Sequence, residues 1–167
     1  SSTFQQSSVA SADALRRDPD NQLLSRGPKT RLLAEQIRDS ALAASGLLNR
    51  TIGGPSVKPY QPAGLWEQSG TGKSYAQDKG LELYRRSLYT FWRRTAPYPS
   101  FMTFDAPSRE VCAASRPRSN TPLQALVLLN DPAFVEAQHA LADRMREFAD
   151  ADDRARIALG FRRVTAR

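Results

Sequence analysis

Residues 117–132 read Pro117-Arg-Ser-Asn-Thr-Pro-Leu-Gln-Ala-Leu-Val-Leu-Leu-Asn-Asp-Pro132, and no other stretch of the chain decides as much of its fold. The Thr121 hydroxyl can cap the start of a helix, and Pro122 suits the first helical position because its ring fixes φ. The apolar run that follows predicts a helix through about Asn130. The stretch contains no nucleophile, metal ligand or phosphate cradle, so it indicates a fold without indicating a function.

Two further helices are predicted after this one. Asp131 and Pro132 repeat the start signal at once, and apolar residues at near-helical spacing predict a helix over about 132–148. The acidic run 150–153 ends that helix and caps a last one. The apolar positions of the two helices are Phe134, Ala137, Leu141, Met145 and Phe148, then Ile157, Leu159, Phe161 and Val164.

A helix is also predicted nearer the start of the chain, over roughly residues 30–46. Pro28 and Thr30 are start signals, and Gly46 suits the C-terminal end because glycine readily adopts the left-handed conformation there. The apolar residues at near-helical spacing are Leu33, Ile37, Ala41, Ala44 and Leu48.

Long irregular segments separate the predicted helices. Residues 51–80 are rich in Pro and Gly, and prolines also interrupt residues 96–116. Residues 81–95 fit a helix by the spacing of their apolar side chains and a strand by their aromatic content. For 86–92 we favour an extended or strand-like segment.

These elements predict a mainly α fold, a helical module with long Pro/Gly-rich loops and one short strand-like segment. Residues 1–29 are expected to be an extended or short-helical lead-in from upstream chain, which needs a neighbour to pack on. Residues 30–167 form the helical part. Because the sequence begins without Met and ends without a helix cap, we expect a fragment of a larger protein.

Composition limits the class of protein. With 167 residues, of which 40% are hydrophobic and 25% charged, the chain is long enough to bury a core and is not disordered throughout. The net charge of +7 could attract nucleic acid, an anionic glycan, anionic lipid or an acidic protein surface. The arginine pairs are scattered, so local helix capping and ion pairing are favoured and nucleic acid is the less favoured partner. No apolar run is long enough to predict a transmembrane segment.

Cys112 and His139 are each the only residue of their kind. A single cysteine excludes an intrachain disulfide, and without a CxxCH motif no c-type haem can attach within this segment. His139 has carboxylates one turn away on both sides, so a solvated ion pair is favoured over catalysis. Ser69-Gly-Thr-Gly-Lys-Ser74 ends like a phosphate-binding loop, but Glu67 stands where that motif needs Gly, and a surface loop is favoured. We therefore expect no cofactor or metal in this segment.

The catalytic candidates are Asp105, Arg109, Arg116 and Arg118. Asp105 lies in an aromatic, Pro-containing loop and is close in sequence to the three arginines. An aspartate that holds its loop through backbone amides or an arginine is the favoured alternative. Residues 84–94 alternate aromatic and basic side chains, as a surface for single strands or sugar rings would, but a half-buried element with basic edges is favoured.

A set of short motifs spread over nearly the whole chain matches one family in order. The motifs are Phe4-Gln-Gln-Ser-Ser8, Asp18-Pro-Asp-Asn-Gln-Leu-Leu24, Arg26-Gly-Pro28, Ala34-Glu-Gln-Ile-Arg-Asp39, Ser45-Gly46, Gly53-Gly-Pro-Ser56, Tyr84-Arg-Arg-Ser-Leu-Tyr89, Phe104-Asp-Ala-Pro107, Asn120-Thr-Pro-Leu-Gln-Ala-Leu126 and Leu129-Asn-Asp-Pro132. With them the chain resembles the C-terminal part of the planctomycete-type secreted domain, known as domain of unknown function 1553.

The resemblance implies a large exported bacterial protein, periplasmic, surface-bound or secreted. Such proteins often carry a c-type cytochrome-like domain, so haem c is expected upstream and not in this segment. No catalytic residues are established for the family. The favoured function is a structural or interaction module that contacts upstream domains of the same polypeptide, an anionic glycan or an acidic protein surface. The alternatives are part of an enzyme acting on an extracellular polymer, with its site shared with an upstream half, and a basic nucleic-acid-binding module.

Overall fold

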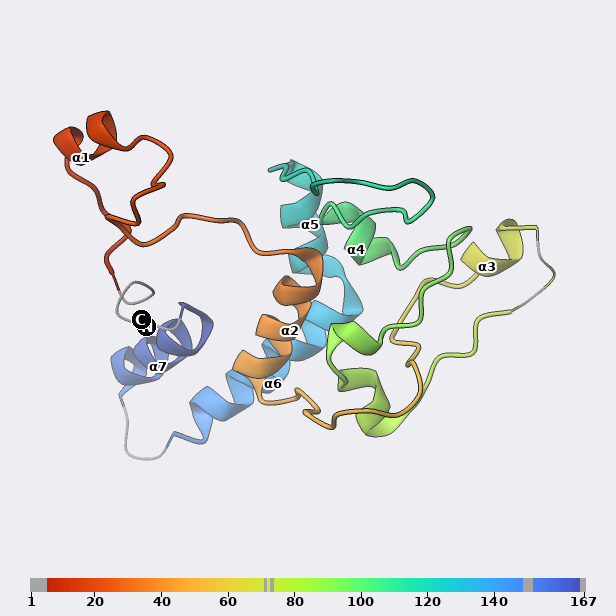
Figure 1. The fold of residues 1–167 in the computed structure, drawn as a ribbon. Helices are drawn as coiled ribbons and strands as arrows, with labels where there is room; N and C mark the ends of the chain where they lie inside the picture. Colours follow the sequence, from red (N-terminus) through yellow and green to blue (C-terminus); the bar gives the residue numbers. More distant parts are fainter. Residues whose placement is uncertain (1–5, 71, 73, 149–151, 166–167) are drawn as a thin grey trace. The chain divides into compact units, whose positions relative to one another are not determined.

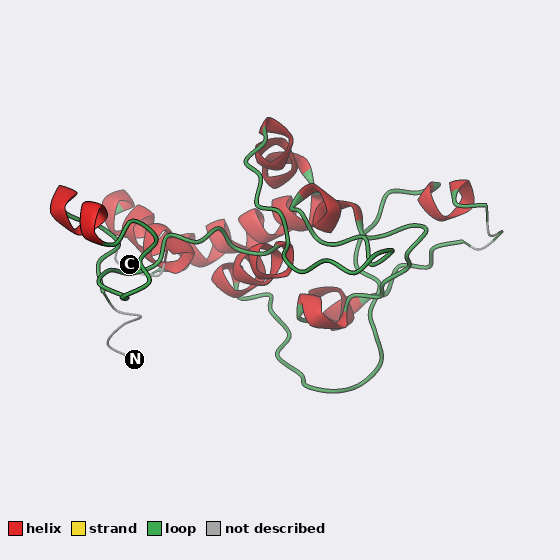
Figure 2. Ribbon diagram, turned by 45° about the horizontal axis from the view of Figure 1, so that its top comes forward, coloured by secondary structure: helices red, strands yellow, loops and turns green. Residues whose placement is uncertain are grey.

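A computed structural model of the chain describes residues 6–70, 72, 74–148 and 152–165. The fold is mainly helical, as predicted, and Figure 2 shows helices joined by long loops, with no strand drawn in the described part of the chain. The chain divides into two compact units, Ser1–Leu32 and Leu33–Arg167.

The unit Ser1–Leu32 contains the helix α1 (Ala12–Arg17). The Ser11 hydroxyl caps its start by accepting a hydrogen bond from the Ala14 amide at 3.1 Å. Asp18 follows the helix, and its two carboxylate oxygens accept from the amides of the turn beyond it at 2.8 and 2.9 Å. Local capping therefore organises this unit.

The unit Leu33–Arg167 is built around two helices that are distant in sequence. Helix α2 packs along α6, as Figure 1 shows, and α7 contacts both of them. The bounds are α2 (Ala34–Ser45), α3 (Leu65–Gln68), α4 (Pro99–Thr103), α5 (Pro122–Asn130), α6 (Pro132–Arg146) and α7 (Asp153–Thr165), with 3-10 helices η2 (Gly80–Tyr84) and η3 (Ser87–Tyr89).

Helix α2 begins at Ala34, four residues later than predicted. The Gln36 side chain accepts a hydrogen bond from the Leu33 amide at 2.9 Å, which satisfies one of the donors that the start of a helix leaves open. The helix ends as predicted, because Gly46 follows it in the left-handed conformation with φ 83°.

The two helix starts in the Pro117–Pro132 stretch are confirmed. The Thr121 hydroxyl accepts from the Gln124 amide and the Gln124 side chain accepts from the Thr121 amide, each at 3.4 Å. Asp131 caps α6 by accepting from the Ala133 amide at 2.9 Å. Helix α6 ends two residues before the predicted end. For α7, Asp152 acts as the expected cap, whereas residues 149–151 lie outside the described part of the chain.

The structure differs from the strand-like expectation at the centre of 86–92, where η3 forms. Side chains of α2 occupy the backbone groups that a strand would need: Arg38 donates to the Arg85 carbonyl at 2.9 Å, and Asp39 accepts from the Ser87 amide at 2.7 Å. The bridges of this region are isolated pairs, Asn49 with Arg85 and Val57 with Thr90.

The core is aromatic and draws on a segment predicted to be irregular. Its residues are Ala34, Tyr98, Phe101, Phe104, Ala106 and Phe134, with Trp92 packed against them. The short helix α4, which was not predicted, brings Phe101 into this cluster. The chain thus covers these aromatic side chains with its own residues.

Candidate functional site

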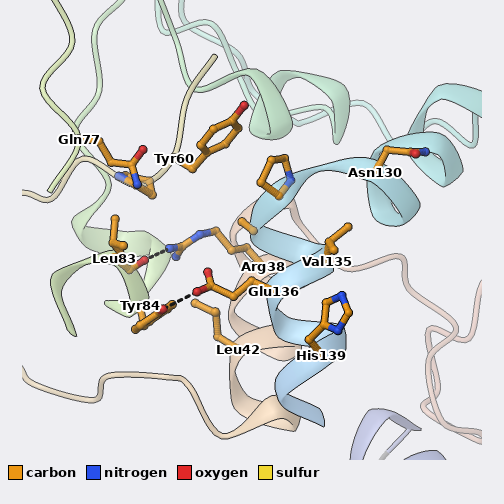
Figure 3. A pocket seen from close by; sticks show the side chains of 13 residues that line it. Arg38, Leu42, Tyr60, Gln77, Leu83, Tyr84, Asn130, Val135, Glu136 and His139 are labelled. Atoms are coloured by element: carbon orange, nitrogen blue, oxygen red, sulfur yellow. Dashed lines mark hydrogen bonds between the residues drawn. The ribbon is translucent and has the colours of Figure 1, made fainter. Parts of the chain in front are cut away.

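An open groove of about 650 Å³ lies between α2, η2 and α6, and Figure 3 shows the side chains that line it. Much of the wall is apolar, with Leu42 contributed by α2 and Val135 by α6. The polar side chains are Arg38, Tyr60, Gln77, Tyr84, Asn130, Glu136 and His139. A concave, mostly apolar surface with a few convergent polar groups is the usual form of a ligand site, so this groove is the candidate functional site.

Arg38 fixes one side of the groove although it is 4% exposed. Its guanidinium donates to the Leu83 carbonyl at 2.6 Å, in addition to the bond to Arg85, and Figure 3 shows it reaching from α2 toward η2. The flat, forked guanidinium can serve two carbonyls at once, which an ammonium group cannot do in the same geometry. Arg38 therefore positions the turn that carries Tyr84.

A hydrogen bond crosses the groove between η2 and α6. The Tyr84 hydroxyl donates to Oε1 of Glu136 at 2.6 Å. This bond raises the pKa of the Tyr84 phenol above its ordinary value of 10, and burial adds to the effect. At neutral pH the phenol is therefore protonated and Glu136 acts as an acceptor.

The polar groups of the groove suit binding better than proton transfer. A general base needs a substrate proton within reach and a group that orients the base. Here the hydrogen bond between Tyr84 and Glu136 joins two elements of the fold, and His139 lies one turn further along α6. A ligand with an apolar body and a hydrogen-bond donor directed at Glu136 fits this arrangement.

Asp105, the first sequence candidate, closes the loop between α4 and α5. Its carboxylate accepts from the Ser119 amide at 2.7 Å and from the Ser119 hydroxyl at 2.8 Å, and Gln124 Nε2 lies 3.5 Å away. Its backbone has φ 62°, in the left-handed region. These contacts make Asp105 an anchor for the loop, and its catalytic role stays a prediction.

Two of the three candidate arginines lie near the same glutamate of α2, Glu35, whose pKa both of their charges lower. Arg109 stacks on the Trp92 ring at 4.4 Å from the centroid. Arg116 pairs with Glu35 of α2 at 2.7 Å, and Arg118 is exposed. The catalytic role of the arginines stays a prediction, like that of Asp105.

Helix α5 presents a second notable surface, which we call the leucine surface: Leu123, Leu126 and Leu129, which follow one another at a spacing of three residues. These side chains are between 55% and 68% exposed. The most buried residue of α5 is polar: Gln124 is 2% exposed and donates to the Thr103 carbonyl at 3.0 Å and to the Ser119 hydroxyl at 2.9 Å. Beside it, Val127 packs against the core. The helix is thus anchored by its amide side chain and turns apolar residues outward.

Other sequence features have a smaller place in the site. Cys112 is exposed. Of the loop 69–74, residues 71 and 73 lie outside the described part. The residues that the structure describes include no group of three or more acidic, His or Cys side chains placed to hold a metal ion. Within the same residues, every helix is too short or too polar to cross a membrane.

Sequence reasoning missed the groove, although one signal for it was present. Arg38 falls four residues after Ala34 and four before Leu42. All three are buried, so they form one stripe on α2. A charged residue in the middle of a buried stripe indicates a specific polar partner.

Fold and groove together define a mainly helical domain with a mostly apolar site and a buried arginine at its side. The chain belongs to the family described as "Protein of unknown function (DUF1553)", which matches residues 1–167 and confirms the resemblance seen in the sequence. No curated protein and no solved structure matches the chain.

Proposed function

We propose that this chain is an interaction module of a larger exported bacterial protein, and that another domain of the same polypeptide docks on the leucine surface of α5. The observation that carries the proposal is the inverted burial of α5, which exposes its leucines and buries Gln124. Contiguous exposed apolar side chains on a soluble domain are typical of an interaction site.

The energetic argument rests on the leucines. Fully burying one leucine side chain stabilises a protein or complex by about 1.5–3 kcal/mol. Even partial burial of these three exposed leucines would therefore give a partner domain a few kcal/mol of favourable free energy. The helix is capped at both junctions, by Thr121 and by the turn at Asp131, so its outward face is presented in a defined orientation.

The finer parts of the proposal come from the family resemblance. They are export, association with a c-type cytochrome domain elsewhere in the polypeptide, and a role in surface or polysaccharide-related processes. An enzyme whose site includes Asp105 and a nucleic-acid-binding module stay as alternatives. The loop-closing contacts of Asp105 favour the interaction module over the enzyme.

The experiment compares the complete natural polypeptide with a variant that carries Leu126→Glu and Leu129→Glu. We expect the variant to expose the junction with the neighbouring domain to limited proteolysis and to raise hydrogen exchange in α5. The matched control is Ile52→Glu, because Ile52 is 84% exposed and lies outside α5. Equal protease resistance of the double variant, the control and the unchanged protein would contradict the proposal.

A further inference from the structure

Two cations lie against a single buried indole outside the groove. Lys58 Nζ is 5.7 Å from the centroid of the Trp66 ring, and Arg93 Cζ is 4.4 Å from it. Because both distances end at the same ring, the two positive charges lie within about 10 Å of each other. Lys58 also lies 5.5 Å from the centroid of Phe91.

The two cations have no acidic partner in the described part of the chain. The ion pairs found there involve other arginines, and none places a carboxylate within 4.0 Å of Lys58 or Arg93. Asp78 is close by, but its carboxylate accepts from the Lys58 backbone amide at 2.6 Å. The ring faces attract both cations without neutralising their charge, so two like charges remain within about 10 Å of each other.

The indole that holds the cations is fixed in place. Trp66 is 6% exposed and packs against Tyr75 at 5.2 Å and Phe91 at 5.7 Å between ring centroids. The Tyr75 hydroxyl donates to the Pro59 carbonyl at 2.5 Å and so ties the segment after α3 to the one before it. Lys58 and Arg93 are partly exposed on this support.

We propose that Lys58 and Arg93 form a binding site for an oxyanion group, the sulfate or phosphate group of a ligand. A guanidinium and an ammonium group both make strong charge-assisted hydrogen bonds to such oxygens, and an anion between them relieves their repulsion. Trp66 is covered, so it offers no free face on which a base or a sugar ring could stack. The site therefore recognises the charged group itself, independently of the leucine surface.

The test measures indole fluorescence of the 167-residue chain titrated with sodium sulfate and with sodium phosphate, at an ionic strength held constant with sodium chloride. We expect saturable binding of at least one oxyanion. The Lys58→Gln and Arg93→Gln variants should bind about tenfold more weakly or not at all. The matched control is Arg94→Gln, which removes the same charge from an exposed neighbour and should leave the affinity unchanged.

The two titrations distinguish the source of the group, since preference for sulfate points to a sulfated glycan and preference for phosphate to a phosphorylated ligand. The Lys58 side chain lies over two aromatic rings and forms no hydrogen bond to the backbone in the described part of the chain, so its variant serves if Arg93→Gln does not fold. Absence of saturable binding overturns the proposal. An equal loss in Arg94→Gln also overturns it, because binding would then depend on net charge alone.

Discussion

At the scale of the residue, Asp105 combines an unusual backbone conformation with an anchoring carboxylate. Aspartate and asparagine tolerate the left-handed region better than other residues with a side chain. The same residue can therefore accept the positive φ and receive the hydrogen bonds of Ser119. This double use explains why a polar residue occurs here in an otherwise aromatic segment.

Replacing Asp105 should affect stability in a graded way. We expect Asp105→Asn, which keeps one acceptor oxygen, to lower the free energy of unfolding by about 1 kcal/mol. Asp105→Ala loses all acceptors and should cost about 2–3 kcal/mol. Urea unfolding of the two variants measures the difference. If the asparagine variant loses a polymer-degrading activity while its unfolding is unchanged, Asp105 is catalytic and the enzyme alternative stands.

The pair of Glu35 and Arg116 predicts a pH dependence. Burial alone would raise the pKa of Glu35, but the hydrogen bond from Arg116, a backbone hydrogen bond and the charges of Arg116 and Arg109 together outweigh it, and the pKa lies below 4.5. A lowered carboxyl pKa stabilises the folded state above pH 4.5, and this contribution disappears as the pH falls through the folded-state pKa. Arg116→Gln should thus cost about 0.5 kcal/mol at pH 7 and nothing in strong acid.

The measurement for this pair is urea unfolding at several pH values between neutral and strongly acidic. Arg118→Gln is the control, because this substitution removes the same charge from an exposed position. A constant difference between the Arg116 variant and the unchanged protein across all pH values would contradict the role of the ion pair.

At the scale of the element, α5 depends on the amide of Gln124. The side chain donates to the Thr103 carbonyl and the Ser119 hydroxyl and lies 3.5 Å from the Asp105 carboxylate. Gln124→Glu would place a second carboxylate beside the first and would leave a carbonyl without its donor. We expect a loss of about 3 kcal/mol at neutral pH, partly recovered in acid as a carboxyl group becomes protonated.

Gln36→Glu is the matched control for this variant. Gln36 occupies the same third position of a helix, in α2, but is exposed. A glutamate there still accepts the Leu33 amide and favours the start of a helix, so the free energy of unfolding should stay within about 0.5 kcal/mol. Thermal and urea unfolding measure both variants. Similar losses of stability in the two would contradict the prediction that the burial of Gln124 causes the effect.

The helices that the sequence predicted well are those whose ends are marked by capping residues. Thr121, Asp131 and Gly46 each act within a few residues, and the helix ends beside them were found within two residues. The 3-10 helices η2 and η3 depend instead on Arg38, which is more than forty residues away in sequence. Local sequence preferences do not reveal contacts between residues that are so far apart along the chain. The groove and the pair of cations at Trp66 both depend on such contacts, so the sequence did not predict them.

At the scale of the whole molecule, arginine side chains hold the long loops of the unit Leu33–Arg167 together. They donate hydrogen bonds to backbone carbonyls, a role that neighbouring strands have in a sheet. Arg38 joins α2 to the turns at 83–87, and Arg85 donates to the Pro55 carbonyl at 2.9 Å and to the Gly53 carbonyl, while it stacks on Tyr89. Two side chains thus organise long irregular segments that have few backbone pairings of their own.

Arg38→Lys should therefore destabilise the entire unit although it conserves the charge. An ammonium group does not have the forked geometry that serves both carbonyls, so one buried or part-buried carbonyl would lose its donor and we expect a loss of about 2–3 kcal/mol. Arg94→Lys, at an exposed position, should change the stability by less than about 0.5 kcal/mol. Differential scanning calorimetry of both variants tests this, and an unchanged melting temperature for Arg38→Lys would contradict it.

The pairing of α2 with α6 also has a consequence for the synthesis of the protein. The ribosome makes α2 before α6, and about ninety residues separate the two helices; at an elongation rate of about 5–20 residues per second this interval lasts roughly 5–20 seconds. During that time the apolar stripe of α2, with the cation of Arg38 in its middle, has no helix to pack on. The charge that later joins the turns of the groove is therefore also one that keeps the nascent stripe hydrated while its partner is still being made.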